Sequence, residues 1–324
     1  MTMIVLIAIA AGCASALMFA SIISGALISL LLLYFAPLPL MVAALGWGPL
    51  AATIGGIGAA TGLGAIFGLP FCIAFVVMMA LPAWWLGHLA LLGRPVAGAE
   101  SNEGATPAPP AMEWYPIGRI LLWIAGFGTL STVATLLTLG TDAATINETL
   151  RAGLLRILSP RGAASSDDIK QRIDAAVMIL PAAAANSAMT MLILNFWLAG
   201  RIAATSGRLR RSWPDLKSTE LPPMTLAALP AAIAFCFSGG LLGMLALTVT
   251  AALLMAYALI GFAVLHTLTL GLKGRGLWLA CAYTTVLLSG GWLILAMTAL
   301  GVADAIFRFR QRFLQGRPPP LPTP

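Results

Sequence analysis

The chain has 324 residues, of which 60% are hydrophobic and only 9% are charged. An ordinary globular domain carries about 25% charged residues, so this composition excludes a water-soluble globular protein and predicts that most of the chain faces lipid or other helices. The formal net charge is +7, but the basic residues fall in loops between apolar segments. We therefore expect them to contact the lipid bilayer at its headgroups, and we expect no nucleic-acid partner.

Residues 1–93 contain no Asp, Glu, Lys or Arg, and His88 is their only ionisable side chain. One helical crossing of a bilayer takes about 20 apolar residues, so this stretch has room for about four crossings. No Lys or Arg precedes the first apolar run, which argues against a secretory signal peptide. The sequence therefore predicts an all-α, polytopic integral membrane helical bundle, kinked by Pro and Gly, with a first crossing at its amino terminus.

The first crossings are delimited by proline and glycine. Residues 3–34 are predicted to form one long or broken apolar helix, which ends in a turn at Pro37 and Pro39. Residues 40–67 are again apolar but contain a Gly and Pro cluster at 46–49 that would break a helix. They form either one kinked crossing or two short segments.

The composition changes after the crossing predicted over 70–92. Residues 93–116 hold five prolines and three glutamates, so we expect a flexible loop. Residues 117–139 form the next crossing. Residues 141–160 are predicted to form an amphipathic helix on the membrane surface, because apolar side chains recur every fourth residue. These are Ile146, Leu150, Leu154 and Leu158.

The second half of the sequence begins with a long helix predicted from 167 to 201. A capping box of Ser165 and Asp168 opens it, and Pro181 kinks it. A basic loop, 201–223, follows. Three more crossings are then expected over 224–238, 241–270 and 277–302, and the Pro-rich end from 317 to 324 is expected to be disordered.

The chain thus divides into a charge-free membrane region (1–92), the Pro-rich loop (93–116), a second membrane region (117–306) and a basic Pro-rich tail (307–324). About eight transmembrane helices are predicted. Counting the 18 Lys and Arg by loop places nine on each side of the membrane, so the positive-inside rule does not fix the orientation.

A stripe of small residues follows one face of the first helix at every fourth position: Ala8, Gly12, Ala16, Ala20 and Ser24. Such a stripe lets another helix approach closely. Its partner is either another helix of this chain or a second protein.

Polar side chains inside a bilayer are costly and often functional. The candidates for ligand binding are Asn186, Asn195, Tyr257 and His266. A spacing of nine residues places the two asparagines, and likewise the tyrosine and the histidine, on nearly opposite helix faces. Neither pair can line one pocket directly, and interhelical hydrogen bonds are the alternative. Asp304 lies four residues before Arg308, in the order that favours a helical ion pair.

The sequence contains no enzyme signature. It has no Walker loop, no HExxH motif and no Ser in a GxSxG context, and no acidic residue lies in the middle of an apolar segment. The four cysteines lie singly, without CxxC spacing, so neither a zinc site nor a disulfide frame is indicated. We therefore expect no catalytic residue, no metal and no cofactor.

Several motifs resemble the YybS-like membrane family (domain of unknown function 2232). They are the small-residue first helix, the turn with Pro37 and Pro39, the break at Gly46–Pro49 with a glycine-rich helix after it, Asn195 before a basic region, and the closing run Gly301–Arg310. The resemblance covers nearly the whole chain.

This family is similar to the substrate-binding S components of energy-coupling-factor importers. The resemblance implies a small-metabolite binding or uptake component of the cell (inner) membrane, with cytoplasmic termini and no ATPase of its own. Its partner would be a transmembrane coupling subunit with ATPases, which would contact the stripe from Ala8 to Ser24. Tyr34, Pro37 and Pro39 would form a gating loop over the substrate. The alternative is a membrane scaffold or assembly factor that recruits protein partners or anionic lipid through the 141–160 helix and the basic loops.

Overall fold

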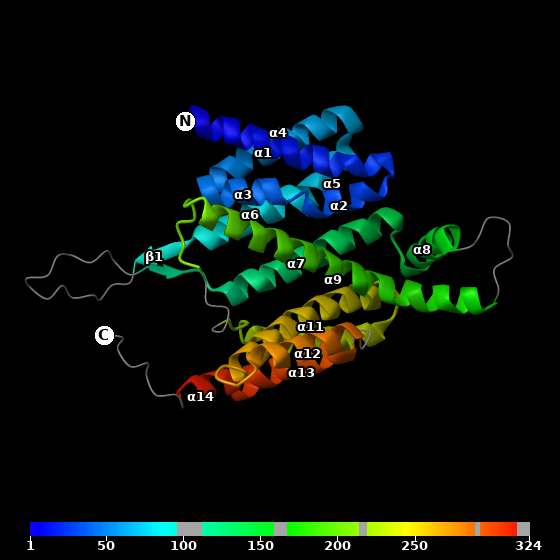
Figure 1. Cartoon of the computed structure of the whole chain (residues 1–324). Coiled ribbons are helices and arrows are strands. Elements are labelled where there is room, and N and C mark those ends of the chain that lie inside the picture. Colours follow the sequence, from blue (N-terminus) through cyan, green and yellow to red (C-terminus); the bar gives the residue numbers. More distant parts are fainter. Residues whose placement is uncertain (96–111, 159–166, 214–218, 289–291, 316–324) are drawn as a thin grey trace, which may run out of the picture. The chain divides into compact units, whose positions relative to one another are not determined.

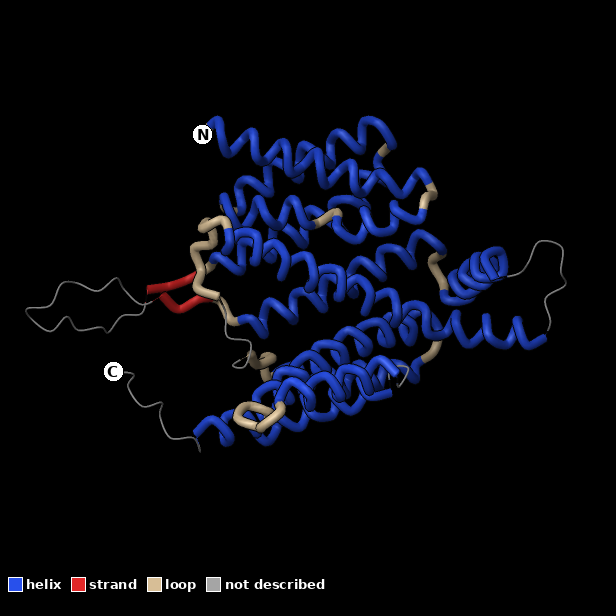
Figure 2. The backbone as a smooth tube through the Cα atoms, viewed as in Figure 1, coloured by secondary structure: helices blue, strands red, loops and turns tan. Residues whose placement is uncertain are grey.

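The structure is a computed structural model of the chain, and it describes residues 1–95, 112–158, 167–213, 219–288 and 292–315. Almost all of these residues are helical (Figures 1 and 2). They form two compact units: the first consists of Met1–Phe127 and Met189–Pro214, and the second of Gly128–Ala188 and Asp215–Pro324. Helices α7 (Ile117–Leu139) and α9 (Asp167–Thr205) each contribute to both units.

The first unit begins with a run of apolar helices. In chain order these are α1 (Thr2–Ala20), the 3-10 turn η1 (Ser21–Ser24), α2 (Leu27–Phe35), α3 (Leu38–Trp47), α4 (Pro49–Phe67), α5 (Leu69–Phe75), the π-helical turn η2 (Val76–Ala80) and α6 (Leu81–Leu91). The first parts of α7 and the last parts of α9 complete the unit.

The helix ends of this unit are set by glycine followed by proline. Gly48 has φ 97° and Gly68 has φ 91°, a region that L side chains rarely adopt and glycine adopts freely. Proline follows within two residues in each case, in the first turn of the next helix, where its missing N–H is not needed. The predicted break at 46–49 therefore lies at Gly48.

The turn predicted at Pro37 and Pro39 is not an interhelical loop. Helices α2 and α3 together form one candidate membrane span, Leu27–Trp47, with the two prolines at its middle, at the N-cap and in the first turn of α3. Proline is tolerated there because the first helical N–H groups have no intrahelical partner. Of the two forms predicted for residues 3–34, the structure has the broken one, divided at Gly25, whose φ is 66°.

Contacts within the first unit define the directions of its helices. Ser15 of α1 donates its hydroxyl to the Ala36 carbonyl at 2.6 Å, and Ala8 packs against Ala43 of α3 and Ala51 of α4. As α1 advances from Ala8 to Ser15 its partner in the second span recedes from Ala43 to Ala36, so these spans are antiparallel. Two antiparallel strands, β1 (Gly93–Pro95) and β2 (Met112–Trp114), follow α6 and are drawn red in Figure 2. Residues 96–111 of the predicted flexible loop lie outside the described residues.

The second unit contains the carboxy-terminal helices. They are α8 (Ala143–Leu158), α10 (Met224–Phe235), the 3-10 turn η4 (Cys236–Ser238), α11 (Gly240–Leu268), α12 (Arg275–Leu288), α13 (Trp292–Phe307) and α14 (Phe309–Gln315). Helix α8 lies within the surface helix predicted over 141–160. The predicted capping residue Ser165 and the end of the tail lie outside the described residues.

The apolar run predicted as one crossing over 277–302 is divided between α12 and α13. Helix α13 runs parallel to α11. Thr298 donates to the Leu254 carbonyl at 3.2 Å, and Gly301 lies against the Tyr257 carbonyl. The contact positions therefore advance together along both helices, as they do only when two helices run in the same direction. Two parallel consecutive spans require a return segment, and α12 provides it.

Within the described residues, seven helices are long and apolar enough to cross a membrane, or eight if α13 and α14, bent by 64°, form one span. Many large apolar side chains are exposed, among them Leu17, Leu27, Ile66, Phe237 and Trp292. Exposure of so much apolar surface is expected only in contact with lipid. The protein is therefore an all-α, multi-pass membrane helical bundle, as its composition predicted.

Candidate functional site

Asn195 closes the break in the second span. Its side-chain amide donates to the carbonyls of Tyr34 and Met191, each at 2.7 Å, and the residue is fully buried. The last carbonyls of a helix have no intrahelical partner, and in a bilayer they must find one inside the protein. Asn195 of α9 satisfies Tyr34, and Ser15 of α1 satisfies Ala36, so both polar side chains hold the broken span in place.

The other three candidates for ligand binding lie in the second unit. The Tyr257 hydroxyl of α11 shares a 2.7 Å hydrogen bond with Thr225 of α10, and the His266 ring shares one of 2.8 Å with the Tyr283 hydroxyl of α12. Asn186 lies on α9 and also has an interaction partner. Thus Asn195 belongs to one unit and the other three to the other, and Tyr257 and His266 each bind a neighbouring helix.

The small-residue stripe of α1 meets a glycine of the same chain. A Cβ on Gly12 would overlap the Gly55 carbonyl of α4, and a Cβ on Gly55 would overlap the Ala8 carbonyl. Ala8 and Gly12 are buried by this approach, whereas Ala16 and Ala20 are half-buried. At the far end, the exposed Ser24 shares a 2.7 Å hydrogen bond with Ser29.

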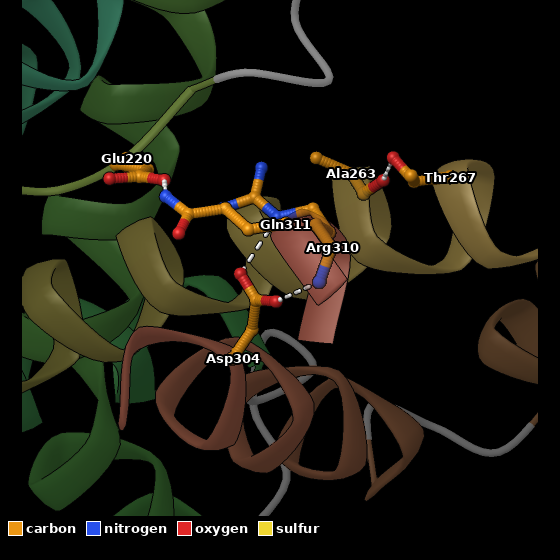
Figure 3. A network of polar contacts seen from close by, with 6 residues as sticks. All are labelled: Glu220, Ala263, Thr267, Asp304, Arg310 and Gln311. Atoms are coloured by element: carbon orange, nitrogen blue, oxygen red, sulfur yellow. Dashed lines mark hydrogen bonds and ion pairs between the residues drawn. The ribbon is translucent and has the colours of Figure 1, made fainter. Parts of the chain in front are cut away.

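A buried ion pair joins α13 to α14 (Figure 3). The Nε of Arg310 lies 2.7 Å from Asp304 Oδ2, with only 5% and 4% of the two side chains exposed, and the Arg310 backbone N–H donates to Oδ1 at 2.9 Å. The partner predicted for Asp304 was Arg308, and this is wrong. Arg308 lies at the bend with φ 55°, which ends α13 and turns the residue two positions later toward the carboxylate.

Arginines at one end of the first unit stack on aromatic rings. The Arg208 guanidinium carbon lies 4.5 Å from the Trp47 ring centroid, and that of Arg201 lies 5.2 Å from the Trp213 centroid. Arg211 donates to the Tyr115 carbonyl at 3.0 Å, and burial lowers the pKa of its guanidinium below the usual value. Stacking leaves guanidinium N–H donors free for an anion.

An apolar hollow of about 390 Å³ opens beside Trp47. Its wall consists of residues from α1, α3 and α9: Ile7, Ala10, Ala11, Leu38, Pro39, Val42, Ala43, Trp47 and Ile202. The indole nitrogen of Trp47 is buried and has no hydrogen-bond acceptor among the described residues. The hollow was not predicted, because it depends on three helices distant in sequence, although the basic loop and the 46–49 break were both recognised.

The described basic residues gather at one end of each unit. In the first unit this end holds the amino terminus, the two strands and the loop after α9, and in the second unit Gln311 lies 2.7 Å from Glu220, next to the bend at Arg308. We use the name basic face for these two sets of residues, one set on each unit. Its eleven basic residues are Arg94, Arg119, Arg201, Arg208, Arg210, Arg211, Lys273, Arg275, Arg308, Arg310 and Arg312, whereas the opposite end of the second unit has four: Arg151, Arg156, Lys170 and Arg172.

Among the described residues, no group of three or more His, Cys, Asp or Glu could hold a metal ion. The comparisons with known proteins give no further guidance: no family model, no curated protein and no solved structure matches the chain.

Proposed function

We propose that the protein is a membrane scaffold or assembly factor that recruits anionic lipid or protein partners to its basic face. The observation that carries this proposal is the concentration of basic residues at that face. Several of its arginines have an aromatic ring, rather than a carboxylate, as their neighbour, as Arg208 has Trp47. Such groups attract acidic surfaces and anionic headgroups.

By the positive-inside rule we expect these basic residues in the cytoplasm. The basic loop over 201–223 contains no apolar run long enough to cross the membrane, so we expect its basic residues on one side. Eleven of the described basic residues belong to these two sets and four to the opposite end of the second unit, whereas the count from the sequence alone was tied.

A small-metabolite uptake component without its own ATPase is the second candidate. The observation in its favour is the break in the span Leu27–Trp47, because discontinuous helices form the binding sites of many transporters. It ranks second because Ser15 and Asn195 already satisfy the carbonyls at this break.

Affinity purification from native membranes in mild detergent, with mass spectrometry of the recovered proteins, tests the proposal. A variant with Arg210, Lys273 and Arg312 each changed to Gln neutralises exposed positions of the basic face. Its control carries the same change at Arg151, Arg156 and Arg172 on the opposite side. We expect partner recovery to fall in the first variant only. Equal recovery from both variants would refute the scaffold, and recovery of a transmembrane coupling subunit with its ATPases would establish the uptake component.

A further inference from the structure

We infer that the hollow beside Trp47 binds one anionic phospholipid, with an acyl chain in the hollow and its phosphate on Arg208. This inference rests on the proposed function, because it names the lipid that one part of the basic face would hold. Three observations carry it: the chemistry of the wall, the shape of the hollow, and the free cation at its end.

The wall selects hydrocarbon over a polar metabolite. Its side chains are Ile, Ala, Leu, Pro, Val and Trp, and the one polar atom among these side chains, the indole Nε1 of Trp47, is buried. A sugar, nucleoside or amino acid would lose its hydrogen bonds to water here without replacement, at a cost of about 1–3 kcal/mol for each polar group. An acyl chain has no such groups to satisfy.

The hollow has the length of an acyl chain. Its wall follows α3 from Leu38 to Trp47, which is about 14 Å at a rise of 1.5 Å per residue and so about half of a hydrocarbon core of about 30 Å. It is an open groove that holds about 390 Å³. A transmembrane helix of a second copy lying across this groove is the competing occupant, and the filling variants below distinguish the two.

The Arg208 guanidinium lies where the phosphate headgroup of the lipid would lie. Trp47 is the last residue of α3, at the basic end of the first unit, and Arg208 lies over its ring at 4.5 Å. Arg208 has no ion-pair partner among the described residues. Tryptophan and arginine are both typical of the interface between hydrocarbon and water.

Native mass spectrometry of the purified full-length protein tests this inference. The delipidated protein is titrated with phosphatidylglycerol or with phosphatidylcholine of the same acyl chains. We expect one tightly held phosphatidylglycerol and a phosphatidylcholine affinity about tenfold lower, the loss of one charge-assisted hydrogen bond. Equal affinity for the two lipids would overturn the role of Arg208, and absence of any retained lipid would overturn the site.

Variants distinguish the contribution of the lipid headgroup to binding from that of the acyl chain. Arg208→Ala is expected to weaken phosphatidylglycerol about tenfold and to leave phosphatidylcholine unchanged. Its control is Arg210→Ala, which removes the same charge from the same loop but not from the Trp47 ring, and it should leave both affinities unchanged. An equal loss in the two variants would mean general charge attraction and would refute the site.

Ala10→Phe fills the hollow from an exposed position and is expected to abolish retention of both lipids. Ala10→Leu repeats the test with a smaller side chain if the first variant does not fold. Full retention of lipid by a folded filling variant would refute the inference. The inference would also be refuted if the wild-type protein were a dimer and the filling variant a monomer. If lipid binding fails while partner recovery still depends on the basic face, the inference is lost and the proposed scaffold stands.

Discussion

At the residue scale, Asn195 stabilises a break in another span: it donates to the Tyr34 carbonyl, which lies 2.7 Å away and 161 positions earlier in the chain. The sequence indicated that this polar group in an apolar helix is costly, but it did not indicate the partner. The Tyr34 carbonyl lacks an intrahelical donor because the helix breaks before Pro37. This break was predicted to end a span, and its position in the middle of a span was not predicted, so the hydrogen bond could not be predicted either. The ion pair of Asp304 was assigned to the wrong arginine for a similar reason: helical spacing cannot anticipate a bend.

The small-residue contact between α1 and α4 gives the first prediction. Gly55→Ala is expected to destabilise the protein by about 1–3 kcal/mol, because its Cβ would overlap the Ala8 carbonyl. Gly58→Ala in the same helix has nothing within 4 Å of the new Cβ, and it should be neutral or stabilising by up to about 1 kcal/mol. Unfolding in sodium dodecyl sulfate followed by circular dichroism measures both, and equal effects would contradict the close approach.

The ion pair beneath α14 gives the second prediction. Arg310→Gln leaves Asp304 buried without its counter-charge, and we expect a loss of about 3–5 kcal/mol. Arg308→Gln removes a neighbouring arginine with no such partner and should change stability by less than about 0.5 kcal/mol. The thermal midpoints of the two purified variants decide between them. A larger loss at Arg308 would restore the pairing expected from helical spacing.

At the element scale, helices were predicted well and their boundaries less well. The apolar runs gave α7, α9 and α11 nearly as they stand, because hydrophobicity over about 20 residues is a strong signal. The misplaced boundaries lie where glycine, and not proline, ends a helix. Gly25, with φ 66°, divides the first apolar run, whereas Pro37 and Pro39 sit inside a span. The two strands after α6 were not predicted, because a flexible loop was expected there.

The start of α8 gives the third prediction, which concerns pH. Asp142 caps this helix: its carboxylate accepts the Thr145 backbone N–H at 3.0 Å and the Thr145 hydroxyl at 2.7 Å. These two hydrogen bonds hold the pKa of Asp142 below its usual 3.8. A carboxyl with a depressed pKa in the folded state stabilises it fully above the unfolded pKa and loses that contribution as pH falls through the folded value. The contribution of this cap is therefore present above pH 3.8 and lost below it.

Amide hydrogen exchange of the first turns of α8, expressed as protection factors, measures this effect. We expect protection near Ile146 to fall between pH 5 and pH 3 in the wild-type protein, relative to α11. Asp142→Asn keeps a good N-cap but does not titrate, so its protection should stay constant over the same range. A parallel fall in the asparagine variant would assign the pH dependence to another group.

At the scale of the whole molecule, the number of crossings decides which side of the membrane each loop occupies. The sequence alone divided the basic residues equally, because residues 277–302 were taken as one crossing. The contacts of α13 with α11 show two parallel spans with α12 between them, and this places Arg308, Arg310 and Arg312 at the same end of the second unit as Lys273 and Arg275. Counting α12 as one more crossing thus changes an equal division of the basic residues into a strong excess on one side.

Cysteine accessibility tests this topology and gives the fourth prediction. Single cysteines replace Asn147 in α8, Lys273 before α12 and Arg312 in α14, in a background with the four native cysteines changed to alanine. We expect a membrane-impermeant maleimide to label Asn147→Cys in intact cells, and to label Lys273→Cys and Arg312→Cys only after permeabilisation.

Lys273 and Arg312 on opposite sides would mean that α12, with 14 residues, does not cross. Asn147 and Lys273 on the same side would mean that the short α10 enters and leaves the bilayer without crossing. Either result would remove the charge asymmetry on which the basic face depends, whereas the expected pattern would make that face cytoplasmic and accessible to soluble partners.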